Sequence, residues 1–199
     1  MPLSIAEYIP QTTKTRRPLL VWLLSVFIAV AFIAAILAAP IAAANHYHGL
    51  ALTLYRAFAT LCHQLPDRSF FIENHKLAVC ARCSGLYGGF ALVLLLYPLV
   101  RQLRSTVLPH PRWLFLAAVP MLVDFSLTFV GVWENTHSSR LFTGLLLGGV
   151  TVFYVMPGLV ELSLRVTRSA SPKKSSLTIS SAEAIAGVQS DYSAPERRI

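Results

Sequence analysis

All three cysteines of this 199-residue chain fall within one short stretch of it. Cys62 is followed directly by His63, and Cys80 and Cys83 are separated by two residues, which makes them a CxxC pair. Three thiolates and one imidazole are the ligands of a closed tetrahedral zinc site. The spacing therefore favours zinc bound by Cys62, His63, Cys80 and Cys83, although two CxxC pairs would be a stronger signal.

The same cysteines also fit two other kinds of chemistry. CxxC is the dithiol spacing of disulfide exchange, and a thiol near a helix N-terminus has a lowered pKa. A structural disulfide that leaves one inert thiol is the other alternative, and an oxidising outer medium would favour it. Haem attachment through CxxCH is excluded because Ser84 follows Cys83.

A second group of polar residues surrounds one unusual carboxylate. Asp124 lies inside an apolar run, where an exposed carboxylate would cost several kcal/mol, so we expect it to face other helices and to have a partner. Arg82, Arg140 and Asp124 suit a membrane enzyme or transporter for a polar or anionic ligand. The alternative is an ion pair of Asp124 with Arg82 or Arg140 that fixes helix packing. The members of the group are Arg68, Arg82, Asp124, Asn135, His137 and Arg140.

The composition indicates that these residues are held by a membrane domain. Hydrophobic residues make up 55% of the chain and charged residues 13%, about half the share of a soluble domain. A compact soluble fold, collagen, a coiled coil and wholesale disorder are therefore excluded. The apolar runs predict an all-α integral membrane protein with helices that span the bilayer at about 19–39, 84–100, 113–131 and 141–160, and a short interfacial or re-entrant helix at about 49–61.

The distribution of Lys and Arg predicts the orientation of these spans. The N-terminal segment, the connection 101–112 and the tail together hold 12 of them, and the other side holds 5. Positive residues concentrate on the cytoplasmic side, so both termini are expected there. The predicted parts are a cytoplasmic segment 1–18, a membrane domain 19–162 with an outer loop 40–83, and a flexible cytoplasmic tail 163–199.

The expected partner is the lipid bilayer and the expected location is the cell membrane, crossed several times. The net charge of +8 follows from this topology, and no basic stripe alternates with exposed aromatics as in a nucleic-acid binder. The first apolar run exceeds the roughly 7–15 residues of a cleaved signal, so it is expected to remain as an anchor, with Pro40 near its end. Self-association does not follow from the sequence.

Local patterns predict how the site is assembled. Two short strands are expected at 70–72 and 77–79, around a turn at 73–76. Two spans carry glycines four residues apart, a spacing that lets helix backbones approach closely in lipid. The pairs are Gly85 with Gly89 and Gly144 with Gly148, and their contact would gather Arg82, Cys83, Arg140 and Thr143 around one outer cavity.

One combination of motifs is specific enough to suggest a family. The motifs are Cys62-His63-Gln64, Pro66 with Arg68-Ser69, Cys80-Ala81-Arg82-Cys83-Ser84-Gly85-Leu86-Tyr87 with Gly89, and then Asp124, Asn135 and Arg140 with Thr143-Gly144. Over about 50–162 the chain resembles the domain-of-unknown-function family 2085, which comprises small prokaryotic multi-pass membrane proteins. Phe125 departs from the glycine that many members have there. The resemblance implies an integral membrane protein and no particular activity.

Overall fold

The computed structural model describes residues 16–132 and 134–170. The described residues up to Leu164 form one compact unit, and the fold below is that of this unit. The described part contains five α-helices, of which four are long and apolar enough to cross a membrane. The predicted all-α membrane class with four spans is therefore confirmed.

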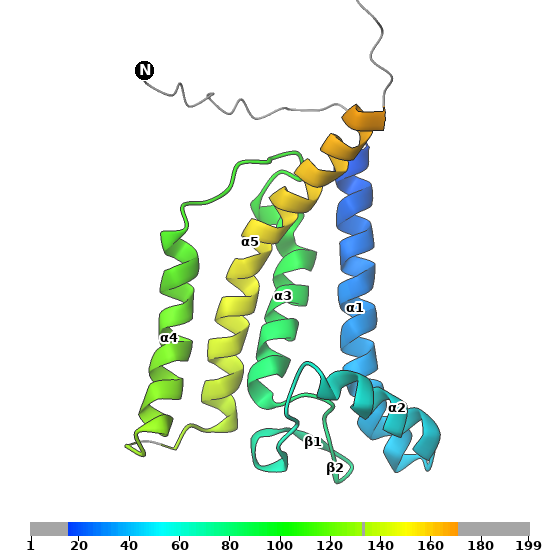
Figure 1. The fold of residues 1–199 in the computed structure, drawn as a ribbon, viewed down its shortest axis with the longest axis vertical. Helices are drawn as coiled ribbons and strands as arrows, with labels where there is room; N and C mark the ends of the chain where they lie inside the picture. The colour runs from blue at the N-terminus through cyan, green and yellow to red at the C-terminus, as the bar shows by residue number, and fades with distance from the viewer. Residues whose placement is uncertain (1–15, 133, 171–199) are drawn as a thin grey trace, which may run out of the picture. The chain divides into compact units, whose positions relative to one another are not determined.

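The four long helices alternate in direction along the chain (Figure 1). They are α1 (Arg17–Ala44), α3 (Ala81–Val100), α4 (Arg112–Phe129) and α5 (His137–Ala170). The short helix α2 (His48–Ala59) packs against α1. As a result, the segment between α2 and α3 and the connection between α4 and α5 lie at the same end of the helices.

Helix α1 is longer than predicted and does not stop at Pro40. Pro40 is buried inside the helix. Although proline lacks the N–H that would complete the helical ladder, membrane helices tolerate this because neighbouring groups satisfy the freed carbonyl. The helix instead ends where His46 adopts a left-handed conformation with φ of +62°, directly after the N–H of Asn45 has bonded to the Ile41 carbonyl.

The start and end of α5 also differ from the prediction, which placed it at 141–160. The Thr136 side chain accepts a hydrogen bond from the N–H of Ser139 at 3.2 Å, so Thr136 caps the helix and α5 begins at His137. A helical backbone can continue through polar residues, so α5 extends beyond the apolar run and ends at Ala170. The predictions for 1–15 and 171–199 lie outside the described residues.

A small hairpin in the α2–α3 segment (residues 60–80) differs from the predicted strands. β1 (Phe71–Ile72) and β2 (His75–Lys76) are antiparallel, with Phe71 opposite Lys76. Glu73 and Asn74 have φ of +47° and +62°, and positive φ at both turn residues is typical of a type I′ hairpin. The predicted strand at 77–79 was wrong because two residues, not four, form the turn.

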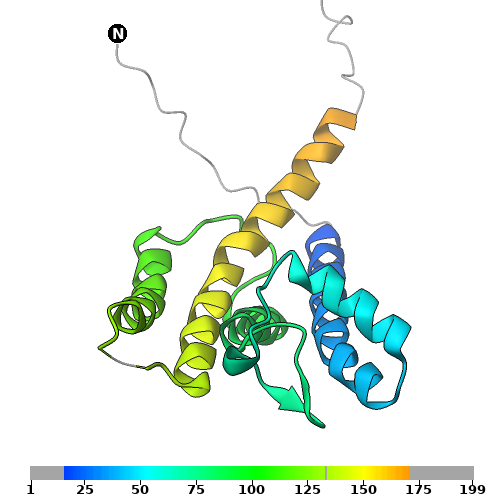
Figure 2. The ribbon, with the colours of Figure 1, turned by 60° about the horizontal axis from the view of Figure 1, so that its bottom comes forward.

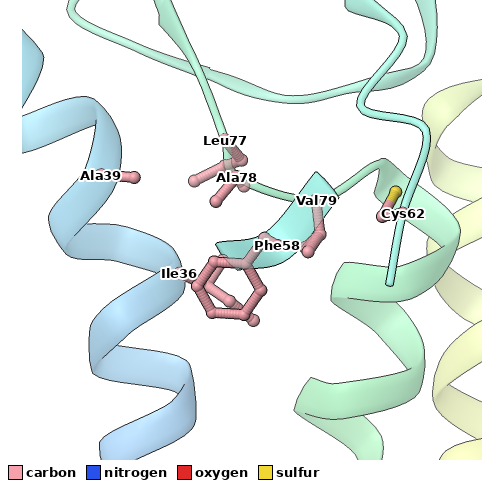
Figure 3. Close-up of a cluster of buried hydrophobic side chains, with 7 residues drawn as sticks. All are labelled: Ile36, Ala39, Phe58, Cys62, Leu77, Ala78 and Val79. Atoms are coloured by element: carbon pink, nitrogen blue, oxygen red, sulfur yellow. The ribbon is translucent and has the colours of Figure 1, made fainter. Parts of the chain in front are cut away.

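The α2–α3 segment is fixed on α1 and α2 by a buried apolar cluster (Figure 3). Ile36 of α1 and Phe58 of α2 pack against the residues just before Cys80. Hydrogen bonds close the segment on itself. The Tyr55 hydroxyl donates to the Lys76 carbonyl, the Lys76 ammonium to the Gln64 carbonyl at 2.8 Å, and the Gln64 amide to the Tyr55 carbonyl at 2.7 Å.

Helices α3 and α5 are in backbone contact at the predicted glycines. A Cβ on Gly89 would lie 2.2 Å from the Leu145 carbonyl oxygen, and one on Gly148 would lie 2.0 Å from the Leu86 carbonyl oxygen. Neither position has room for a side chain. Further along the same contact, Leu94 and Tyr97 of α3 pack with Val152, Met156 and Val160 of α5 in a second buried cluster.

Helix α4 is joined to the other helices differently. Ala117 is its one buried residue, while large side chains such as Phe115 and Leu122 are exposed. The attachment is polar near both ends. The hydroxyl of Tyr154 on α5 donates to the His110 carbonyl at 2.9 Å, just before α4 begins, and Asp124 makes the bonds described below.

The backbone contact predicts different effects on stability for alanine at two neighbouring glycines of α3. We expect Gly89→Ala to lower the stability of the detergent-solubilised chain by about 1–3 kcal/mol, because the new methyl overlaps the Leu145 carbonyl. Gly88 has nothing within 4 Å of its Cβ position. Gly88→Ala is the matched control and should be neutral or stabilising by up to about 1 kcal/mol. Thermal unfolding measures both, and equal effects would contradict the contact.

Candidate functional site

The three cysteine sulfurs converge. The Sγ atoms of Cys62, Cys80 and Cys83 all lie within 4.8 Å of one another. Cys62 is buried, the other two are partly buried, and all three are free thiols. Tetrahedral coordination with Zn–S bonds of about 2.3 Å places sulfurs about 3.8 Å apart. The group is therefore within reach of one ion, after small side-chain adjustments.

Different elements position these sulfurs. Cys80 is the residue that precedes α3, and Cys83 lies in the first turn of that helix. Cys62 follows α2, where its N–H bonds to the Phe58 carbonyl at 2.9 Å. The N–H of Cys80 donates to the Cys62 Sγ at 3.2 Å, which joins the two ends of the α2–α3 segment directly.

The surroundings of Cys80 favour its thiolate form. The neighbouring Cys83 thiol lowers the pKa of Cys80 below its usual value. Burial acts in the opposite direction, while the N–H groups of Cys83 and Arg82 add to the lowering of this pKa. The thiolate is both the metal-binding and the nucleophilic form of cysteine.

A second set of contacts surrounds Asp124, five residues before the end of α4. Its Oδ2 accepts hydrogen bonds from Arg82 Nη2 and Asn135 Nδ2, both at 2.7 Å, and its Oδ1 accepts one from Ser139 Oγ at 2.8 Å. Arg140 Nε donates to Asn135 Oδ1 at 2.6 Å. Asp124 therefore pairs with Arg82, whereas Arg140 reaches it only through Asn135.

A cavity of about 620 Å³ joins the two sets. Figure 2 looks toward this end of the molecule, where the α2–α3 segment lies over the beginning of α3 and beside that of α5. The cavity wall combines sulfurs, basic and neutral polar groups, and apolar side chains. The lining residues are Leu61, Cys62, His63, Gln64, Leu65, Arg68, Cys80, Arg82, Cys83, Phe125, Thr128, Phe129, Asn135 and Arg140.

Two histidines from the sequence analysis lie apart from the sulfurs. His63 is exposed and lines the cavity, but it does not belong to the sulfur group, because Cys62 turns inward and its neighbour outward. His137 does not line the cavity; its ring packs against Phe70 with centroids 5.6 Å apart.

Ser139 is a site residue that sequence reasoning missed. Its hydroxyl bonds to Asp124, as described above. The signal that could have found it is Thr136 as a helix cap, because the cap places Ser139 in the first turn of α5 beside Arg140.

Comparison with known proteins identifies the family of the chain. A family model described as a predicted membrane protein (DUF2085) matches residues 62–154. An uncharacterised protein of Methanocaldococcus jannaschii is 37% identical over 118 residues, which cover 59% of this chain and 76% of that protein. The chain belongs to the DUF2085 family.

A second relative is an uncharacterised protein of Methanothermobacter thermautotrophicus. It is 33% identical over 91 residues, which cover 44% of this chain and 78% of that protein. No solved structure matches the chain significantly. The part matched by the DUF2085 model starts at Cys62 and contains all three cysteines and the Asp124 network, whereas α1 and α2 precede it.

The ion pair of this DUF2085 protein predicts non-additive mutational effects. Side-chain exposure is 21% for Arg82 and 10% for Asp124, so removal of one partner leaves a poorly solvated charge. We expect Asp124→Asn to destabilise the protein by up to about 3–5 kcal/mol in thermal unfolding. Adding Arg82→Gln should cost less than the sum of the single changes.

The matched control for this cycle is Asp67→Asn, which changes an exposed carboxylate. Its effect should stay within about 0.5 kcal/mol. Simple additivity of the Arg82 and Asp124 changes would contradict a direct energetic link between the two side chains.

Proposed function

We propose that this membrane protein binds one divalent metal ion, zinc, through Cys62, Cys80 and Cys83. The observation that supports the proposal is the convergence of the three sulfurs within 4.8 Å. Thiolate ligands select soft metals such as zinc over magnesium or calcium. Three thiolates with one further ligand are a common tetrahedral zinc site.

His63 is the proposed fourth ligand. It follows Cys62 directly and lines the same cavity, so a rotation of its side chain is the movement that binding would require. A water molecule is the alternative ligand, and it would leave the ion open to the cavity, as in catalytic zinc sites. On the charge distribution of the chain, we place this site on the outer side of the membrane with both termini in the cytoplasm.

The proposed ion would connect the two ends of the α2–α3 segment. Cys62 and Cys80 are separated by 18 positions in the chain and are joined by one N–H to sulfur hydrogen bond. Coordination adds a stronger link between the same positions. The ion would therefore stabilise the wall of the cavity as well as supply a Lewis acid beside it.

Metal analysis of the detergent-purified full-length protein tests the site. We expect about one zinc ion per chain, and loss of most of it in Cys62→Ser, Cys80→Ser and Cys83→Ser, because each change removes one thiolate. Cobalt substitution should give a thiolate-to-cobalt charge-transfer band that the serine variants lack. Wild-type protein that holds neither metal would contradict the proposal.

Two histidine variants separate the alternatives for the fourth ligand. His63→Ala weakens metal binding if the imidazole coordinates the ion, and preserves it if water does. His75→Ala is the matched control, because its ring bonds to the Glu73 carbonyl at 2.8 Å and does not line the cavity. Equal loss of metal in both variants would indicate a general loss of folding.

Thiol–disulfide exchange is a second candidate function, supported by the position of Cys80 directly before a helix with Cys83 one turn later. The Cys80 thiolate would attack one sulfur of a partner disulfide, form a mixed disulfide and release the other partner sulfur as a thiolate. The thiolate of Cys83 would then attack the Cys80 sulfur, form the Cys80–Cys83 disulfide and release the second partner sulfur as a thiolate.

Thiol trapping in cells distinguishes this function from metal binding. In Cys83→Ser the mixed disulfide cannot be resolved, so we expect a complex with a partner to accumulate at Cys80 and to disappear under reducing conditions. Cys62→Ser is the control, because the CxxC pair remains intact. A redox state that never changes in the wild type would contradict exchange.

A further inference from the structure

The cavity beside the sulfurs carries excess positive charge. Arg68, Arg82 and Arg140 line it, and no carboxylate among the described residues does. Arg82 is paired with Asp124. Neither Arg68 nor Arg140 has an ion-pair partner in the part of the chain that the structure describes. A divalent ion held by three thiolates would lower this excess by one charge without reversing it.

The three guanidinium groups are carried by separate elements that meet at the cavity. Arg68 ends the 3₁₀ turn η1 (Pro66–Arg68), Arg82 lies in the first turn of α3 and Arg140 in the first turn of α5. Arg140 experiences the positive charges of both other arginines, which the negative charges of Asp124 and Cys80 offset in part. Such convergence is unfavourable unless an anion offsets it.

Two of these guanidinium groups are already oriented, and each has N–H donors that its orienting bond does not use. Arg140 is held through its Nε on Asn135, so its terminal Nη atoms are not used in that bond. Arg82 is held through Nη2 on Asp124, and its Nε is buried without an acceptor. A guanidinium group fixed at one edge presents its remaining donors in a set geometry, which is the arrangement that binds phosphate best.

Apolar side chains line the same cavity beside the charged ones. Phe125 and Phe129 of α4 are 52% and 82% exposed, and the Arg82 guanidinium lies over the Phe125 ring, 5.8 Å from its centroid. Leu61 and Leu65 also line the cavity and are exposed. A free inorganic ion gains nothing from apolar side chains, whereas a hydrocarbon chain is stabilised by contact with them. Guanidinium groups and apolar side chains in one cavity therefore match an anionic amphiphile.

We propose that the cavity binds the phosphate headgroup of an anionic lipid, with the arginines on the phosphate oxygens and the acyl chains along Phe125 and Phe129. The volume of about 620 Å³ suits a headgroup and the first part of its chains. Basic pockets between membrane helices on the cytoplasmic or matrix side bind anionic lipid headgroups, and the same chemistry is proposed here for the outer side. The proposal is independent of the metal, since it uses different side chains.

Lipid binding to the full-length protein in a neutral detergent tests this. The probes are dioleoyl phosphatidic acid, dioleoyl phosphatidylcholine and inorganic phosphate, measured by native mass spectrometry and by the shift in unfolding temperature. We expect saturable binding of phosphatidic acid and little of the zwitterionic lipid. Arg68→Gln and Arg140→Gln should each weaken phosphatidic acid binding about tenfold.

Arg56→Gln is the matched control, because Arg56 is an exposed arginine of α2 that does not line the cavity. It should bind phosphatidic acid as the wild type does. If Arg56→Gln weakens binding as much as the cavity variants, or if those variants bind normally, the proposal is overturned. Inorganic phosphate that binds as tightly as the lipid, and is lost in the same variants, would overturn the lipid as ligand and identify free phosphate.

Arg68→Gln and Cys62→Ser separate loss of folding and loss of metal from loss of lipid. The Arg68 side chain is exposed and makes no hydrogen bond or ion pair among the described residues, so Arg68→Gln decides the matter even if Arg140→Gln fails to fold. Cys62→Ser should lose metal and retain phosphatidic acid. Parallel loss of both ligands in a folded Cys62→Ser protein would contradict the independence of the two sites.

Discussion

The backbone contact between α3 and α5 is the constraint on which the rest of the site depends. Glycines on both helices leave no room for a Cβ, so the two axes approach as closely as the main chains allow. This approach places the first turns of the two helices side by side, with Arg82 on one and Arg140 on the other. The charges are therefore brought together by the shape of two helices and not by attraction between the charged groups.

The sulfurs depend on a different kind of support. Cys62 and Cys80 end a segment with little regular structure, and its backbone is held by side chains, namely Tyr55, Lys76 and Gln64. The buried cluster below it fixes the segment against α1 and α2. Cys83, by contrast, is carried by the first turn of α3, so the sulfur group joins this segment to the α3–α5 contact.

The spans could be predicted from the sequence because apolar runs of that length have no other stable environment. A partner for Asp124 could be expected for the same reason, but the choice of Arg82 over Arg140 depends on the Asn135 amide, which occupies Arg140. The helix ends depend on single local contacts such as the Thr136 cap. His63 lies outside the sulfur group because adjacent residues of an irregular segment face opposite ways, and no sequence pattern reports which way.

Helix α4 has one fully buried residue, Ala117, and half-buried residues along the same face, and polar bonds attach it near His110 and at Asp124. Dispersion forces between apolar side chains weaken gradually as helices separate, but a directional bond is either made or broken. In a bilayer, lipid tails replace lost apolar contacts at little cost. The place of α4 beside α3 and α5 therefore depends strongly on one carboxylate, which accepts hydrogen bonds from Arg82, Asn135 and Ser139.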